Sequence, residues 1–100
     1  MSEHVAYSPL PVVLVVENDI FERLSRAATL RRQGFEVFEV ADVAEAATVL
    51  KKIAVDLLIS DISLIDGAVL AQLAKEHQPT MQIAWTLDSR QSSVETTVVN

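Results

Sequence analysis

The sequence predicts an α/β fold in which a parallel β-sheet lies between two layers of helices. Two observations support this prediction. Apolar runs of strand length alternate with segments of helical spacing, and the resulting order of elements is β-α-β-α-β-α-β. Such an order requires right-handed crossovers, which place helices on both faces of the sheet. We therefore expect a flavodoxin-like, doubly wound, three-layer α/β/α domain that ends after its fourth or fifth strand.

The central strand is expected at residues 55–61, where an apolar run ends in Asp61. Its apolar residues are adjacent and show no 3.6-residue spacing, which favours a strand buried on both faces. Residues 12–16 and 81–85 form two similar runs.

Each of these three strands is followed by, or ends in, a polar side chain: Glu17, Asp61 and Thr86. Open α/β sheets bind their ligands beyond the carboxyl ends of their strands. If the three strands are parallel neighbours, these side chains converge on one edge of the sheet.

Helical spacing predicts a first helix over residues 20–33, with Gly34 as the residue that ends it. A strand is expected at residues 35–40. Asp42 and Glu45 then have capping-box spacing at the start of an Ala-rich helix that extends to about residue 53.

A short loop is expected at residues 62–66, followed by a third helix with apolar spacing from residue 68 and ended by Pro79. Residues 96–99 are a candidate fifth strand. No closing helix follows them, so we expect either a short domain or further elements beyond residue 100. A partner or a further segment would then cover the open sheet edge.

The composition indicates one domain at residues 11–100, preceded by a loose lead-in at residues 1–10. A formal net charge of −6 argues against direct nucleic-acid binding, which needs a basic surface. The absence of cysteine excludes disulfides and thiolate metal sites. The longest apolar run, residues 12–16, is too short to span a membrane, and no signal peptide is evident. These features predict a cytoplasmic protein without membrane contact.

Carboxylates that meet at strand ends attract a hard divalent cation, and Mg²⁺ prefers such oxygen ligands. Beside the ion, Asp61 could act as a nucleophile toward phosphorus, with the Thr86 hydroxyl nearby. The simpler alternative is that Asp61 only ends a strand or caps a turn.

Several phrases of the sequence resemble response-regulator receiver domains, in the right order and spacing over about residues 11–87. The strongest are Val-Leu-Val-Val-Glu-Asn-Asp at 13–19, Asp-Leu-Leu-Ile-Ser-Asp-Ile-Ser-Leu at 56–64 and Ile-Ala-Trp-Thr at 83–86. Gly-Phe-Glu-Val at 34–37 and Ala-Asp-Val-Ala-Glu-Ala at 41–46 match the family as well.

The resemblance implies a role for each matching position. Asp61 would be the phosphoacceptor, and Thr86 the hydroxyl that follows the phosphoryl group when the domain switches. The Mg²⁺ ligands would be Glu17, Asn18, Asp61 and the backbone carbonyl of Ser63.

Four positions depart from the family pattern. Asn18 stands where a second acidic residue is usual, which removes one charge and weakens Mg²⁺ binding by roughly 1–4 kcal/mol. The loop after Asp61 is short and lacks proline, and Trp85 is bulkier than the usual residue. The family's lysine at the end of the fifth strand has no counterpart, because the last lysine here is Lys75.

The resemblance implies a non-enzymatic signalling domain that takes a phosphoryl group from a histidine kinase or phosphotransfer protein and switches a surface read by an output protein or domain. Homodimerisation is left open. Asn18, the short loop and the missing lysine favour an alternative, a receiver-like interaction module that works without phosphorylation. A flavin-binding flavodoxin is a weaker candidate, because the acidic residues after the first strand would repel a phosphate.

Two groups of basic side chains lie outside these motifs. The first helix carries arginines that could contact a phosphodonor protein or simply form a solvated face: Arg23, Arg26, Arg31 and Arg32. His4 and His77 have no partner at ligand spacing, so we expect surface positions for both.

Overall fold

The computed structural model describes residues 9–61, 64–86 and 96–99. They form a five-stranded sheet with strand order β2-β1-β3-β4-β5, in which β1, β2, β3 and β4 are parallel. The elements in chain order are β1 (Val12–Val16), α1 (Ile20–Arg32), β2 (Glu36–Val40), α2 (Val43–Lys52), β3 (Leu57–Asp61), α3 (Leu64–His77), β4 (Gln82–Thr86) and β5 (Thr96–Val99). The predicted α/β fold is confirmed.

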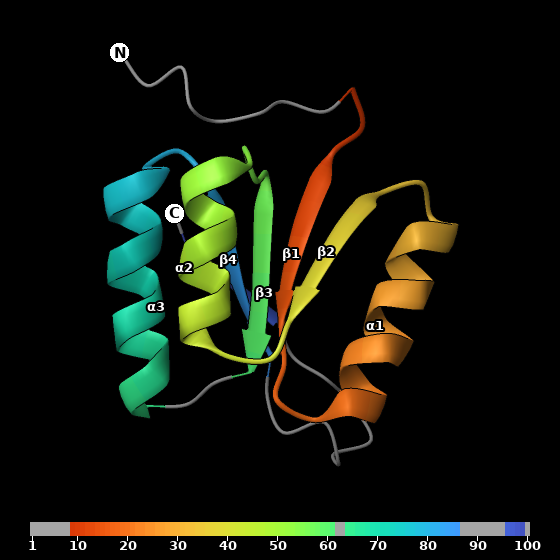
Figure 1. The fold of residues 1–100 in the computed structure, drawn as a ribbon, viewed down its shortest axis with the longest axis horizontal. Helices are drawn as coiled ribbons and strands as arrows, with labels where there is room; N and C mark the ends of the chain where they lie inside the picture. Colours follow the sequence, from red (N-terminus) through yellow and green to blue (C-terminus); the bar gives the residue numbers. More distant parts are fainter. Residues whose placement is uncertain (1–8, 62–63, 87–95, 100) are drawn as a thin grey trace.

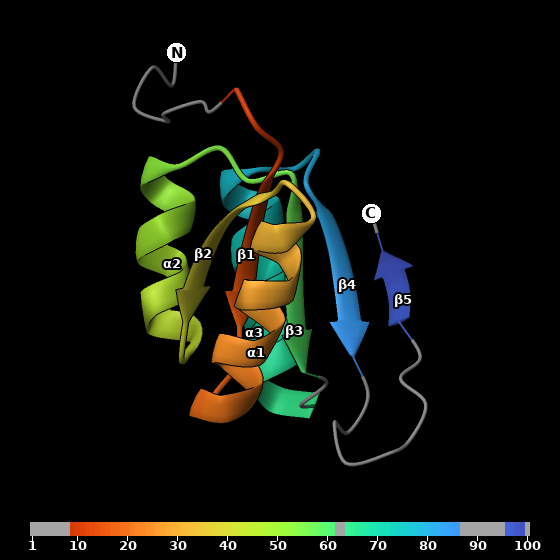
Figure 2. The same cartoon turned by 90° about the vertical axis from the view of Figure 1, so that its right-hand side faces the viewer.

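The helices form two layers around the sheet. Figure 1 shows α2 and α3 together on one face and α1 on the other. Figure 2, which looks onto α1, shows β4 and β5 to the side of this helix. A groove of about 320 Å³ lies between α1 and β3, and its lining includes Arg26, Leu30 and Ile59. Within the described residues, α1 therefore covers its face of the sheet only in part.

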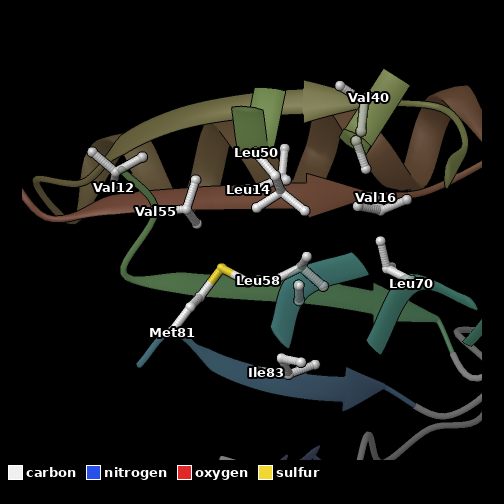
Figure 3. Close-up of a cluster of buried hydrophobic side chains, with 12 residues drawn as sticks. Val12, Leu14, Val16, Val40, Leu50, Val55, Leu58, Leu70, Met81 and Ile83 are labelled. Carbon is white, nitrogen blue, oxygen red and sulfur yellow. The ribbon is translucent and has the colours of Figure 1, made fainter. Parts of the chain in front are cut away.

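The core has one cluster on each face of the sheet. The larger cluster lies under α2 and α3 and contains the fully buried Leu14, Leu50, Leu58 and Leu70 (Figure 3). The smaller cluster, on the α1 side, contains Val13, Val15, Ala27 and Val37. All five residues of β1 are buried, as expected for a central parallel strand with apolar neighbours on both faces.

Both helices that follow β1 and β2 begin with an aspartate cap. The Asp42 side chain accepts the Glu45 N–H at 2.9 Å, which confirms its predicted role as N-cap, and Glu45 accepts the N–H of Ala41, the residue before the cap, at 2.8 Å. At the end of α1, Gly34 has a φ of 98°, the left-handed conformation that glycine adopts without strain.

Two predicted boundaries were wrong by two residues or more. The central strand begins at Leu57 and not at residue 55, although the Asp56 backbone N–H already donates to the Val12 carbonyl at 2.9 Å. The third helix already begins at Leu64, within the predicted 62–66 loop, of which residues 62–63 lie outside the described residues. Asp66 and Gly67 suggested a loop. An acidic residue is nevertheless favourable in the first helical turn, and a helical glycine costs only about 1 kcal/mol.

The candidate fifth strand is present, but it runs antiparallel to β4, with Thr96 opposite Thr86 and Val99 opposite Ile83. The sheet is therefore mixed and not wholly parallel. A parallel connection needs a crossover of about a dozen residues or more, whereas antiparallel strands accept shorter links. The stretch from 87 to 95 is shorter than such a crossover.

None of the helices in the described part of the chain is long and apolar enough to cross a membrane.

Candidate functional site

The register of the sheet brings three strand ends to the same edge. Val16, the last residue of β1, is paired with Ser60 of β3, so the next residue, Glu17, lies level with Asp61. Asp61 is in turn paired with Thr86 of β4. Figure 1 shows the arrowheads of β1 and β3 pointing to one end of the sheet, where α1 begins. The backbones of the three predicted residues therefore lie side by side on neighbouring strands.

Glu17 is the buried acidic residue of this edge, with 4% of its surface exposed. Its backbone N–H continues the ladder between β1 and β2 by donating to the Val40 carbonyl at 2.9 Å. Its carboxylate accepts the Asp19 N–H at 3.0 Å. Burying a carboxylate costs free energy unless hydrogen bonds or a cation compensate for the lost water. A buried glutamate beyond a strand end, where α/β sheets bind their ligands, is therefore a candidate functional residue.

The two residues after Glu17 differ in role. Asn18 is exposed at the start of the turn between β1 and α1. Asp19 is also exposed, and its Oδ1 accepts the Glu22 N–H at 3.0 Å, which makes it the N-cap of α1. This carboxylate therefore stabilises the helix N-terminus.

Sequence reasoning missed a basic residue that holds this turn. Arg23 Nη1 donates to the Glu17 carbonyl at 3.0 Å, and Arg23 Nε lies 3.7 Å from Glu39 Oε1 on β2. A signal was present in the sequence, since Arg23 shares the core-facing stripe of the helix with Ala27 and Leu30. A charged residue in such a stripe indicates an internal partner.

The same glutamate also holds Arg31, whose Nη1 lies 3.1 Å from Glu39 Oε2 and whose Nη2 donates to the Val37 carbonyl at 2.9 Å. Arg23 and Arg31 are thus engaged with β2, whereas Arg26 lines the groove beside β3. The predicted solvated face therefore holds for only some of the four arginines.

The chemistry of the described donors suits Mg²⁺, because Glu17 and Asn18 offer carboxylate and amide oxygens. Within the described residues, no group of three or more His, Cys, Asp or Glu side chains could hold a metal ion. The predicted set also needs the Asp61 side chain and Ser63, both of which lie outside what the structure describes. The ligand and phosphoacceptor roles therefore stay predictions. Of the two histidines, His77 is half-buried in the last turn of α3, and His4 lies outside the described residues.

Four parallel strands in the order 2-1-3-4, with a buried carboxylate just beyond the carboxyl end of β1, define a flavodoxin-like domain of the receiver class. Solved receiver structures share this fold. A response regulator receiver protein from Sinorhizobium medicae WSM419 has a TM-score of 0.71 and 29% identity, covering 79% of this chain and 67% of that one. The receiver domain of the hybrid histidine kinase CckA has a TM-score of 0.67 and 35% identity, covering 74% of this chain and 72% of that one. The chain belongs to the response-regulator receiver family.

A curated relative agrees with this assignment. Aerobic respiration control protein ArcA of Escherichia coli K12 is 32% identical over 68 residues, which cover 66% of this chain and 29% of ArcA. The chain thus spans less than a third of that relative's length. No family model matches the chain.

Proposed function

We propose that this chain is a phosphoacceptor receiver domain, in which Asp61 takes a phosphoryl group from the phosphohistidine of a histidine kinase or a phosphotransfer protein. The observation that supports this proposal best is the buried carboxylate of Glu17, level with Asp61 at the edge where α/β sheets bind ligands. Receiver domains among the solved structures most similar to this chain support it as well.

The chemistry is a transfer between two nucleophiles. A carboxylate oxygen of Asp61 forms a bond to phosphorus while the P–N bond of the donor breaks, and the electron pair stays on the imidazole nitrogen. A bound Mg²⁺ would supply charge neutralisation to the phosphoryl oxygens. Glu17 and Asn18 would hold it through oxygen atoms, with the Asp61 carboxylate and the Ser63 carbonyl completing the protein ligands. The cation is held weakly because Asn18 carries no charge.

The response is a switch without turnover on a separate substrate. The phosphoryl group places about −1.5 to −2 charge at the sheet edge in place of the single negative charge of the Asp61 carboxylate, and the Thr86 hydroxyl moves toward it. This movement alters a surface that an output protein or domain reads, with or without homodimerisation. The proposed setting is the cytoplasm, where histidine kinases present their phosphohistidine.

The N-terminal half of α1 supports contact with a phosphodonor protein. Ile20, Phe21 and Leu24 are 52%, 80% and 50% exposed, although they are large apolar side chains. They lie on the first turns of the helix that begins at the acidic edge (Figure 1). Exposed apolar patches of this kind are typical of protein–protein contact sites.

A second candidate function is a receiver-like interaction module that does not use phosphate. One observation favours it: Asn18 is exposed where the family has a second acid. Such a module would bind its partner through the same fold in a single state.

Beryllofluoride, a mimic of the phosphoryl group, separates the two functions. In NMR spectra recorded with millimolar Mg²⁺, we expect it to shift the backbone amide resonances of Asp61 and Thr86. The control is Asp61→Asn, which removes the attacking oxygen and should abolish the shifts. Unchanged spectra for the natural sequence would refute phosphoacceptance and favour the interaction module.

A further inference from the structure

The turn between β1 and α1 is tied to β2 by a largely buried arginine. The side chains of Arg23 and Glu39 are only 18% and 21% exposed, and Nε of the arginine lies 3.7 Å from Oε1 of the glutamate. Arg23 also donates from Nη1 to the Glu17 carbonyl at 3.0 Å. One guanidinium therefore joins the acidic edge to the neighbouring strand through two different donor atoms.

We propose that Arg23 is a positioning residue for the acidic edge, which orients Glu17 and Asn18 for cation binding. As far as it concerns Mg²⁺, this inference rests on the proposed function. The oxygen that Arg23 holds belongs to the peptide unit between Glu17 and Asn18. Because a peptide unit is planar, fixing this oxygen also fixes the direction in which the chain leaves Glu17 and enters Asn18.

A second hydrogen bond fixes the other side of the same turn. The Asp19 N–H donates to Glu17 Oε2 at 3.0 Å, so the direction of the carboxylate depends on where the Asp19 amide lies. If Arg23 no longer holds the Glu17 carbonyl, the peptide unit can rotate. This rotation moves the Asp19 amide and, with it, the carboxylate.

An arginine is required at this position because of its geometry. The planar guanidinium offers five N–H donors in fixed directions, so Nε can face Glu39 while Nη1 faces a carbonyl. A lysine ammonium is a single point of charge on a flexible stem. Arg23→Lys should therefore keep the attraction to Glu39 but hold the Glu17 carbonyl less well.

The chain itself supplies a matched control. Arg31 contacts the same Glu39, at 3.1 Å, and also donates to one backbone carbonyl, that of Val37, at 2.9 Å. It lies in the last turn of α1, away from the acidic turn. Arg23→Met and Arg31→Met thus each remove one ion pair and one bond to a carbonyl, but only the first touches the peptide unit after Glu17.

The experiment measures hydrogen exchange of the Asp19 amide without metal, and Mg²⁺ affinity by NMR titration. For Arg23→Met we expect about tenfold faster exchange at Asp19 and at least about tenfold weaker Mg²⁺ binding, the usual effect of losing a residue that orients a metal ligand. Arg23→Lys should fall between this variant and the natural sequence. Arg31→Met should leave both quantities within about twofold.

Equal effects of Arg23→Met and Arg31→Met would overturn the proposal, because the loss would then act through Glu39 or general stability. Unchanged hydrogen exchange of the Asp19 amide in both Arg23 variants would also overturn the proposal. If Arg23→Met does not fold, Arg23→Lys and Arg31→Met provide the comparison. If the natural sequence binds no Mg²⁺, the proposed function fails, while the metal-free exchange still decides the role of Arg23.

Discussion

The Gln78 side chain bonds to three backbone groups between the end of α2 and the start of β3, and replacing it should destabilise the protein strongly. Its Oε1 accepts the Val55 N–H at 2.7 Å, ahead of β3. Its Nε2 donates to the Leu50 carbonyl at 2.9 Å and to the Ile53 carbonyl, both at the end of α2. Gln78→Met keeps the length of the side chain but removes all three hydrogen bonds.

The expected loss of stability comes from the three backbone groups that would lose their hydrogen-bond partner. Removing a partner from a buried backbone group costs about 1–3 kcal/mol, and these three bonds are partly buried. With some compensation by water, we expect a loss of about 2–4 kcal/mol from a total of about 5–15 kcal/mol. For a domain of this size, the melting temperature should fall by roughly 10–20 °C.

Urea unfolding followed by circular dichroism measures this loss, and the slope of the transition should stay unchanged. The control is Gln72→Met on α3, because Gln72 is exposed and makes only a 3.4 Å contact with Glu76. We expect it to change stability by less than about 0.5 kcal/mol. A loss below about 1 kcal/mol for Gln78→Met, or equal losses for both variants, would refute this reasoning.

Three further changes have expected outcomes. Asn18→Asp should tighten Mg²⁺ binding about tenfold in calorimetry, since it restores a charge at the acidic edge; an unchanged dissociation constant would show that Asn18 is not a ligand. Gly34→Ala should lower the free energy of unfolding by about 1–2 kcal/mol, measured with urea, because alanine is strained at a φ of 98°. The strain comes from the backbone alone, since nothing lies within 4 Å of the added methyl group. An unchanged stability would mean that the turn relaxes. Asp42→Ala should lower the free energy of unfolding by about 0.5–2 kcal/mol, because α2 loses its N-cap. Asp42→Asn keeps an acceptor oxygen and should retain most of this stability. Equal losses for the two variants would contradict the capping role.

Local patterns predicted most of the fold. Apolar runs gave the four parallel strands, the Asp42–Glu45 spacing gave the start of α2, and Gly34 gave the end of α1. The meeting of the strand ends that carry Glu17 and Asp61 followed from the rule that parallel strands end on one edge. These features depend on residues close in sequence or on general topology.

Features that depend on distant pairings were missed. The contact between Arg23 and Glu39 exists only once β2 lies beside β1, and a sequence does not show which charged pairs the register brings together. One local feature was missed as well, the N-cap role of Asp19, which its Asp-x-x-Glu spacing with Glu22 could have indicated. The direction of β5 was also missed, because direction depends on the length and course of the connection and not on strand propensity.

The antiparallel direction of β5 determines which of its ends could contribute to chemistry at the acidic edge. Its first residue, Thr96, sits opposite Thr86, whereas its last residue, Val99, sits opposite Ile83, about 10 Å back along β4. Receiver domains bring a lysine to their phosphoacceptor from the far end of the fifth strand. In this arrangement the far end of β5 leads away from Asp61, so a lysine placed there would not lie beside the acidic edge.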